Sequence, residues 1–248
     1  MDASQSREEY KFLLPADLAE SVRAQIAEHL PADQGSPGGY DIVSDYFDNA
    51  ERLTYWQKLV GHPNRRRIRT RTYLSSKAHR QPAAFIEIKH KLLDDTVKRR
   101  IPVPAAFLDE RDPAAPLVLP PIDEDDSQPR SQWRARAELE ELLAKGFNHP
   151  VVRIWFHRHA YDAGRTGRLR VTFDSQLRWQ PLAELAGDLP PTPRPLFGPG
   201  ETIMEVKTAG AVPYWFRSLV AQHRLVPRGT SKYARALQHL NPSTQLVG

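Results

Sequence analysis

The chain has 248 residues, 40% of them hydrophobic and 26% charged, which is typical of a packed globular protein and excludes a disordered chain. It contains no cysteine, which excludes disulfides, thiolate metal sites and cysteine nucleophiles, so any metal must be held by carboxylates or histidines. The net charge of +5 and the pI near 9.5 indicate an acidic partner, and nucleic acid, anionic lipid, a nucleotide or an inorganic polyanion would each fit.

Length and targeting signals indicate one domain without a membrane anchor. Because no segment resembles a linker, we expect a single domain over residues 1–248. The N-terminal residues lack the basic and apolar regions of a signal peptide, and no apolar run approaches ~18 residues. A cytoplasmic protein with no membrane segment is therefore expected.

The first elements expected along the chain are a strand, a helix and a second strand. The first strand covers residues 8–14 and places three charged residues on one face: Arg7, Glu9 and Lys11. A helix follows Pro15, because Asp17 and Glu20 have capping-box spacing and apolar residues recur at helical intervals. The second strand covers residues 40–48. Three bulky residues after it are interpreted as packing anchors rather than as stacking platforms for nucleic-acid bases: Leu53, Tyr55 and Trp56.

Three strands with charge on alternate residues are expected between residues 65 and 103. Their charged faces carry Arg65, Arg67, Arg69 and Arg71, then Glu87, Lys89 and Lys91, then Lys98 and Arg100. Arg99 departs from the pattern and falls on the apolar side. Each strand alone would suit an ordinary antiparallel sheet with a solvated outer face. Because like charges on adjacent strands repel, three neighbouring cationic strands instead indicate a bound polyanion.

Helices and strands alternate in the second half of the chain. We expect helices over residues 105–112, 131–146, 212–225 and 228–240, and strands over residues 151–162, 168–174 and 203–208. The acidic run from Asp123 to Asp126 is interpreted as a solvated loop rather than a metal site, and residues 189–200 as a surface loop. Thr230 or Ser231 caps the last helix, so Lys232 in its first turn is either solvated or part of an anion site there.

About eight strands interrupted by helices predict an α+β fold, namely a closed antiparallel eight-stranded β-barrel with helices packed outside. The same pattern, with charged side chains on alternate residues and so on one face of the strand, recurs in the later strands. One carries Arg168, Arg170 and Asp174, and another carries Glu205 and Lys207. If the apolar faces of the strands pack outward, the charged faces line a tunnel. The lowered dielectric constant there strengthens each contact to phosphate. Arg158 lies on the same strand face as its apolar neighbours, so we expect it near a strand end or in a polar interior.

In these motifs the sequence resembles the triphosphate tunnel metalloenzymes, a CYTH-like superfamily, and within it the polyphosphate polymerase domain of the vacuolar transporter chaperone (VTC) family. The resemblance spans nearly the whole chain and rests on ordered motifs: REEYKF, SDYFD, RTRTY, FIEIK, VKRR, IWFHRHAY, RLRVTFD, MEVK and SKY. It implies a tunnel enzyme that transfers the γ-phosphate of ATP to a growing inorganic polyphosphate chain. ATP and polyphosphate are the implied partners, with no nucleic acid expected, and Mg²⁺ or Mn²⁺ is the implied cofactor.

The resemblance also implies roles for individual residues. Those implied in catalysis are Lys11, Arg69, Arg71, Lys89, Arg158, Arg170 and Glu205. Those implied in further phosphate binding are Arg7, Lys98, Arg100, Lys207 and Lys232. Glu205 matches the acidic metal ligand of the family, and Glu87 and Glu9 are candidate metal ligands beside it. Such a set suits phosphoryl transfer, in which the protein positions the reactants and stabilises spread negative charge.

The first strand departs from the Glu-x-Glu-x-Lys pattern of tunnel hydrolases, because Arg7 replaces the first carboxylate. This exchange removes a potential metal ligand and adds a phosphate clamp, which favours chain growth over water activation. The regulatory SPX domain and membrane helices of the eukaryotic polymerases are not expected here. Two alternatives remain open: a tunnel-type triphosphatase acting on tripolyphosphate or a nucleoside triphosphate, and a non-catalytic polyanion-binding module with a steep salt dependence.

Overall fold

The computed structural model describes residues 7–33, 38–74, 83–93, 95–121, 129–163, 169–187 and 190–241. Its strands are β1 Arg7–Leu14, β2 Tyr40–Asp48, β3 Asn64–Tyr73, β4 Ala83–Leu92, β5 Asp95–Val103, β6 His149–Asp162, β7 Leu169–Pro181, β8 Arg194–Pro195 and β9 Thr202–Ala209. Its helices are α1 Ala16–His29, α2 Leu53–Leu59, α3 Ala105–Asp109, α4 Arg130–Ala144, the short 3₁₀ helix η1 Leu182–Leu185, α5 Tyr214–Gln222 and α6 Lys232–Leu240. Arg168 and the acidic run from Asp123 to Asp126 lie outside the described residues.

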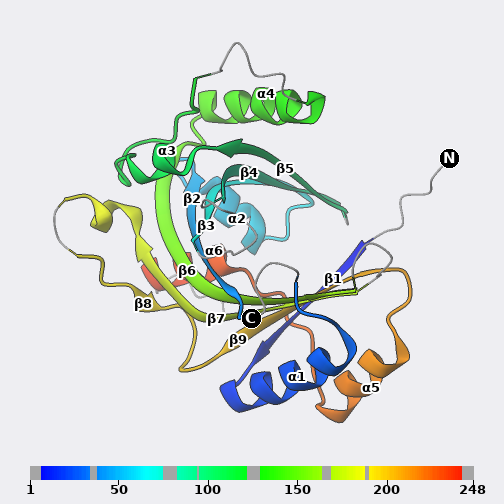
Figure 1. The fold of residues 1–248 in the computed structure, drawn as a ribbon. Coiled ribbons are helices and arrows are strands. Elements are labelled where there is room, and N and C mark those ends of the chain that lie inside the picture. Colours follow the sequence, from blue (N-terminus) through cyan, green and yellow to red (C-terminus); the bar gives the residue numbers. More distant parts are fainter. Residues whose placement is uncertain are drawn as a thin grey trace.

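All the described strands belong to one antiparallel sheet, which is strongly curled (Figure 1). The concave face of this sheet is called the groove here. The order of the eight long strands is β1-β9-β7-β6-β2-β3-β4-β5, and β8 pairs with β7. β1 and β5 form the two edges, and their described residues do not pair with each other. The predicted closed barrel is therefore wrong: the fold is α+β, with an open half-barrel. The loop expected over residues 189–200 also contains β8 and buries Leu196.

Charged side chains at its edges keep the sheet open. The alternation of side chains along the strands does not by itself require the first and last strands to pair. Edge strand β5 exposes Lys98, Arg99 and Arg100, and charged side chains on an edge disfavour further pairing. Cations from the two ends of the sheet also face each other, since Lys11 of β1 helps to lower the pKa of Lys89. Glu9 of β1 offsets this repulsion, with Oε2 3.7 Å from Lys89 Nζ. Side chains, not backbone hydrogen bonds, bridge the gap.

Helix ends follow from local chemistry. α1 begins directly after Pro15, which has φ −57° and no side-chain cap, so the capping box predicted at Asp17 and Glu20 is wrong. Asp17 instead lies in the first turn, where the helix dipole favours a carboxylate. α4 ends as predicted before Gly146, whose φ of +84° is accessible to glycine at little cost. None of the helices in the described ranges combines the length and apolarity that crossing a bilayer requires.

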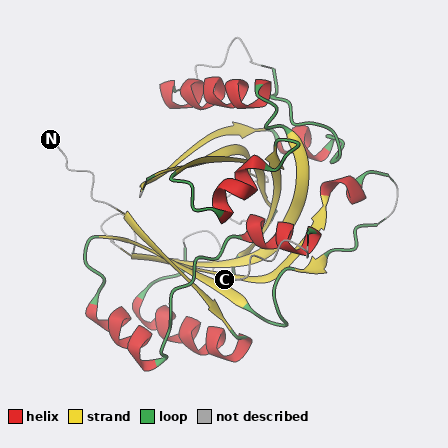
Figure 2. Cartoon of the chain, turned by 180° about the vertical axis from the view of Figure 1, so that it is seen from behind, coloured by secondary structure: helices red, strands yellow, loops and turns green. Residues whose placement is uncertain are grey.

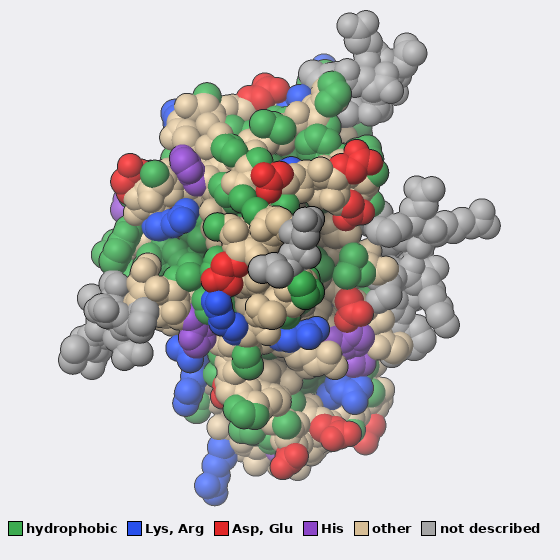
Figure 3. Space-filling view, turned by 90° about the vertical axis from the view of Figure 1, so that its left-hand side faces the viewer, with side chains coloured by type: hydrophobic (Ala, Val, Ile, Leu, Met, Phe, Trp, Pro, Cys, Tyr) green, Lys and Arg blue, Asp and Glu red, His purple; other side chains and the backbone are tan. Residues whose placement is uncertain are grey.

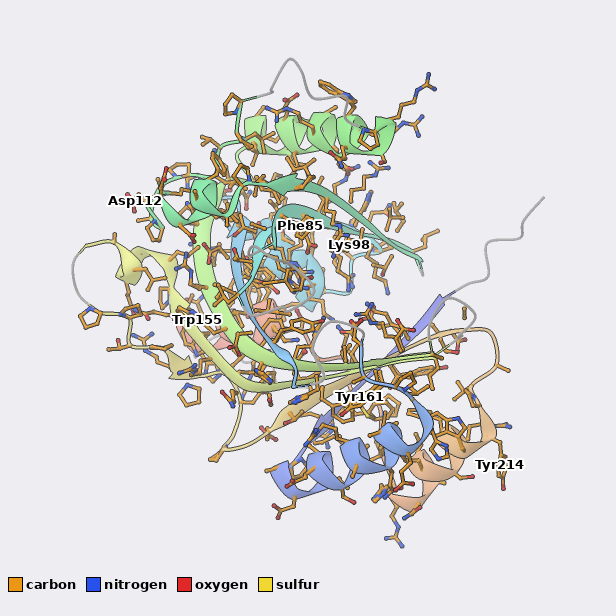
Figure 4. All side chains as sticks on the ribbon, in the orientation of Figure 1. Phe85, Lys98, Asp112, Trp155, Tyr161 and Tyr214 are labelled. Carbon is orange, nitrogen blue, oxygen red and sulfur yellow. The ribbon has the colours of Figure 1, made fainter. Side chains whose placement is uncertain are left out.

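The apolar side chains of β1, β4, β5, β7 and β9 pack outward against helices, as predicted. The prediction is wrong for β2 and β6, because their cluster, which includes Ile42, Tyr46, Ile154 and Phe156, packs with α6 on the concave face. α1 and α5 cover β1, β7 and β9 through a cluster that includes Val22, Ile26, Val171, Val206 and Phe216. α4 covers β4 and β5 through a second cluster that includes Ile86, Ile88, Ile101, Leu139 and Leu142. Arg99 is explained by this packing, because it pairs with Glu138 of α4 on the outer face. Figure 4 likewise places Tyr161 on the side of the sheet that faces α1.

One helix does not pack outside. α6 lies against the concave face, where Tyr233 stacks on Tyr46 of β2 with ring centroids 5.3 Å apart. The hydroxyl of Tyr233 donates to Asp48 at 2.7 Å, and Asp48 also accepts from the backbone of α2 at Thr54 and Tyr55. Seen from behind, α2 and α6 lie across the curled sheet (Figure 2). The first turn of α6 therefore points its residues into the groove.

Candidate functional site

The most buried charges of the groove surround Phe156 of β6. Lys232 Nζ lies 4.7 Å from the ring centroid, Arg158 Cζ 5.4 Å and Arg71 Cζ 5.8 Å. The carboxylate of Asp174, 0% exposed, accepts from Arg158 Nε and Nη2 at 2.6 and 2.8 Å and from Lys232 Nζ at 2.5 Å. Two of these three cations thus share one carboxylate, and the net positive charge of the group attracts an anion.

Arg71 of β3 forms no ion pair with a carboxylate among the described residues, although the charge of Glu87 acts on it from further away. It is only 5% exposed, and its Nε donates to the neutral hydroxyl of Ser44 at 3.2 Å. Burial and the neighbouring Arg69 lower the pKa of Arg71, so the protein alone stabilises this charge poorly. A buried unpaired guanidinium is costly, and its planar fork matches the oxygens of phosphate. Arg71 therefore points directly to a phosphate-like ligand.

Arg69, two residues earlier on β3, is held by the protein. Its Nε and Nη2 lie 2.8 and 2.7 Å from Glu87 Oε2, and Nη1 donates to the Tyr46 hydroxyl at 3.3 Å. Lys98 of β5 pairs with the other oxygen of Glu87. Burial would raise the pKa of Glu87, but Arg69, Arg71 and Lys98 lower it to about 2. Glu87 is therefore a fixed anion that orients Arg69 and Lys98 on this wall of the groove.

The opposite wall presents a mixed cluster around Lys11 of β1. Lys11 Nζ lies 3.0 Å from Glu9 Oε1 and 3.4 Å from Glu205 Oε2, and Lys207 Nζ lies 2.9 Å from Glu205 Oε1. Burial would raise the pKa of Glu205, but Lys11, Lys207 and Arg158 hold it well below its usual range. Both carboxylates are thus ionised near neutral pH, and each already has a cationic partner.

The remaining predicted cations lie nearer the rim of the groove. Arg170 is 42% exposed, with Nη2 3.2 Å from Asp33 and Nη1 3.9 Å from Asp162. Arg100 lies over the ring of Phe85, with Cζ 4.3 Å from its centroid. Figure 4 shows Phe85 and Lys98 together on the strands of one wall. Only the backbone of Arg7 is described, so its proposed role as a phosphate clamp lies outside the described side chains.

For a divalent cation, the donors that fit are Glu9 and Glu205. Their carboxylates converge on one ammonium, that of Lys11, and Mg²⁺ is commonly held by one or two carboxylates together with substrate phosphates. Glu87 lies apart from them, with both oxygens engaged by Arg69 and Lys98. Within the described ranges, no three His, Asp or Glu side chains gather as a preformed metal cluster. The residues therefore fit a cation that binds together with a phosphate ligand.

Some groups in the groove were not assigned a role from the sequence. Tyr46 is the clearest: burial would raise its pKa, but Arg69, Arg71 and Lys232 lower it to about 8. Asp174 accepts hydrogen bonds from Arg158 and Lys232. The sequence pattern indicates only that Asp174 lies on a charged strand face. The alternation of side chains along β2 could have indicated Tyr46, because it places Tyr46 on the same face as Ser44. Both side chains contact arginines of β3 in the groove. Figure 3 shows one outer face of the molecule, on which acidic and basic side chains are interspersed.

Comparisons with known proteins give one family match and distant structural neighbours. The family model described as the VTC domain matches residues 6–241. A proposed adenylate cyclase from Bacillus halodurans has a similar structure, with a TM-score of 0.53, 10% identity, and coverage of 92% of this chain and 94% of that one. A protein of Pyrococcus horikoshii OT3 matches with a TM-score of 0.47, 12% identity, and coverage of 94% and 99%. No curated protein matches the sequence.

Proposed function

The chain belongs to the VTC domain family, and from that premise we propose that it is a divalent-metal-dependent polyphosphate polymerase. It transfers the γ-phosphate of ATP to the end of a growing inorganic polyphosphate chain within the concave groove. The observation that supports this proposal best is Arg71, which is buried without a carboxylate among the described residues. A guanidinium in that position needs an anion, and phosphate matches its geometry.

The chemistry requires positioning rather than a protein nucleophile. A terminal oxygen of the polyphosphate chain attacks the γ-phosphorus, the bond to the bridging oxygen of ADP breaks, and ADP leaves with that electron pair. Arg71, Arg158 and Lys232 bind the transferred group where negative charge is spread over its oxygens. Asp174 holds two of these cations in place, so little reorganisation is needed during transfer.

Glu9 and Glu205 are the residues that would hold the divalent cation. When bound, the cation neutralises charge on the nucleotide phosphates and withdraws electron density from the phosphorus. Lys11 lies between the two carboxylates, so its ammonium would be available to a phosphate oxygen if they held the cation. On the other wall, Glu87 keeps Arg69 and Lys98 oriented toward the chain.

The proposal is tested by incubating the protein with ATP and Mg²⁺ or Mn²⁺ and sizing the products on gels. We expect ADP and a ladder of phosphate polymers, with a lag that short polyphosphate primers shorten. A tunnel-type triphosphatase is the second candidate, because Glu9 and Glu205 converge as the carboxylates of a hydrolytic metal site would. If the protein released orthophosphate from tripolyphosphate and formed no polymer from ATP, the triphosphatase would be the correct function instead.

Substitution of the metal carboxylate separates catalysis from binding. Glu205→Gln removes one negative charge from a cationic groove, so we expect turnover to fall at least about a hundredfold while polyphosphate affinity is kept or increased. Turnover across a metal titration and metal-free binding measure the two effects. Glu87→Gln is the matched control: it should weaken polyphosphate binding, because Arg69 and Lys98 lose their orienting anion. Full activity of Glu205→Gln at every metal concentration would refute the ligand assignment.

A further inference from the structure

A second cationic cluster lies at the α2 side of the groove, outside the site described above. It consists of Lys58 on α2, Arg65 and Arg67 on β3, and Lys91 on β4, and is called here the α2 cluster. Arg65 lies opposite Lys91 in the β3–β4 register, so the two side chains emerge on one face as close neighbours. Arg67 follows two residues on, about 7 Å further along the strand.

The α2 cluster lacks a carboxylate partner in the part of the chain that the structure describes. None of its four residues forms an ion pair within the described residues, whereas most cations of the groove do. The Arg65 guanidinium donates to the backbone oxygen of His62, at 2.5 Å. Burial, then Arg65, Arg67 and Lys91, lower the pKa of Lys58, which shows that these charges lie close enough to repel one another. Like charges held together in this way weaken the fold unless an anion lies between them.

Arg67 joins the α2 cluster to the groove. Its Nη1 donates to Ser231 Oγ at 3.3 Å, at the first turn of α6, and its Cζ lies 4.8 Å from the ring centroid of Tyr233. Its Nε is buried and donates to no acceptor in the described part of the chain. In the register, Arg67 lies opposite Lys89, the next cation of the wall. A row of cations on β3 and β4 therefore runs from the groove past α6 toward α2.

We propose that the α2 cluster is a binding site for the outer phosphates of a polyphosphate chain whose end lies in the groove. The inference rests on the proposed function, because it assigns the direction in which a chain leaves the reaction centre. A short ligand such as tripolyphosphate fills the groove alone, whereas a long chain also contacts Lys58, Arg65, Arg67 and Lys91. The cluster thereby makes long chains bind more tightly than short ones.

Anionic lipid is the other phosphate source to consider, because Val60 and Leu93 are exposed on the same rim, at 74% and 68%. The backbone N–H of Leu93 donates to Pro63 at 3.0 Å, which ties the β4–β5 turn to the segment after α2. The polymer is favoured because all four members of the α2 cluster are half-buried rather than fully exposed. Half-buried cations suit a single flexible chain better than a flat bilayer surface.

The test compares the double variant Lys58→Ala/Lys91→Ala with the wild type. Dissociation constants for tripolyphosphate and for long-chain polyphosphate are measured without metal or nucleotide, at several salt concentrations. We expect the variant to lose about tenfold in affinity for the long chain, with a shallower salt dependence, and to bind tripolyphosphate as the wild type does. The matched control is Arg134→Ala/Arg217→Ala, which removes two exposed cations from the outer helices and should change neither constant.

Other results would overturn the inference in distinguishable ways. If the wild type bound neither ligand, the proposed function itself would fail. If it bound both but the double variant kept the wild-type ratio of the two constants, the α2 cluster would not be a chain subsite, while the proposed function would stand. If the double variant lost only its binding to phosphatidylserine vesicles, the cluster would face lipid. Lys58→Glu provides a second variant, for which we expect a larger loss in long-chain affinity alone.

Discussion

At the scale of residues, the unusual feature of the groove is how differently its cations are partnered. Arg158 and Lys232 share Asp174, Arg69 and Lys98 share Glu87, and Arg71 has only a hydroxyl partner in the described part of the chain. A cation with a carboxylate partner contributes to the fold whether or not ligand is bound. A buried cation without one contributes mainly to binding.

Substitution of Arg71 should therefore separate binding from stability. In Arg71→Leu we expect the unliganded melting temperature to stay the same or rise, because a buried unpaired charge is removed. The stabilisation by tripolyphosphate should largely disappear. Thermal melting with and without tripolyphosphate measures both. Arg99→Leu is the matched control, since Arg99 pairs with Glu138 on the outer face: its unliganded melting temperature should fall and its ligand shift should persist.

Two residues of the groove give it a predictable pH dependence. Burial and Lys11 lower the pKa of Lys89 to about 8, and the Arg69, Arg71 and Lys232 cations bring that of Tyr46 to about 8 against the effect of burial. As pH rises through about 8, Lys89 loses a positive charge and Tyr46 gains a negative one, and both changes weaken anion binding. We expect tripolyphosphate affinity to fall over this range. The fall should be shallower in Lys89→Arg/Tyr46→Phe, and an equal fall in that variant would exclude these residues as its source.

At the scale of elements, α6 matters because it reaches the groove from the far end of the sequence. Ser231 caps the helix by accepting from the N–H of Ala234, and Lys232 then extends to Asp174 on β7. Arg67 on β3 contacts the same turn through Ser231. The first turn of α6 is thus fixed between two strands that are not neighbours in the sheet.

Loss of the buried carboxylate should release this element. Asp174→Asn leaves Arg158 and Lys232 without their anion, so we expect a loss of about 3–5 kcal/mol in unfolding free energy and faster amide exchange in α6. The pKa of Asp174 is lowered to about 2 in the folded protein, so its contribution is complete above about pH 4 and disappears as the pH falls through about 2. Denaturant unfolding measures the loss. Tripolyphosphate should restore part of it, and equal stability of variant and wild type at pH 7 would contradict this account.

At the scale of the whole molecule, the open sheet brings together two cationic walls without backbone pairing between β1 and β5. The described contact across the gap is the ion pair between Glu9 and Lys89. A bound polyphosphate would add contacts to both walls. It would therefore hold the half-barrel together as well as occupy it.

Ligand should accordingly stabilise the whole fold. At a concentration about 1,000 times its dissociation constant, tripolyphosphate should add about 4 kcal/mol to the unfolding free energy by mass action. The rise in melting temperature should shrink as salt is added, because exposed charges are screened. Sulfate at matched ionic strength is the control and should give a much smaller rise. No shift with excess tripolyphosphate at low salt would contradict the groove as a phosphate site.

The sequence by itself determined which residues of a strand share a face, because side chains alternate along an extended strand. It thereby predicted the outward packing of the apolar faces of β1, β4, β5, β7 and β9 and the cationic face of β3 and β4. It also predicted a cap of α6 at Thr230 or Ser231, of which the structure selects Ser231. It resolved Arg158 only as far as two alternatives, and the structure selects the polar interior, where Asp174 receives it. What the tertiary structure alone decided is whether the sheet closes and which charges meet. Strand alternation carries no information about pairing between β1 and β5, nor about partners such as Lys232 and Asp174 that lie 58 residues apart.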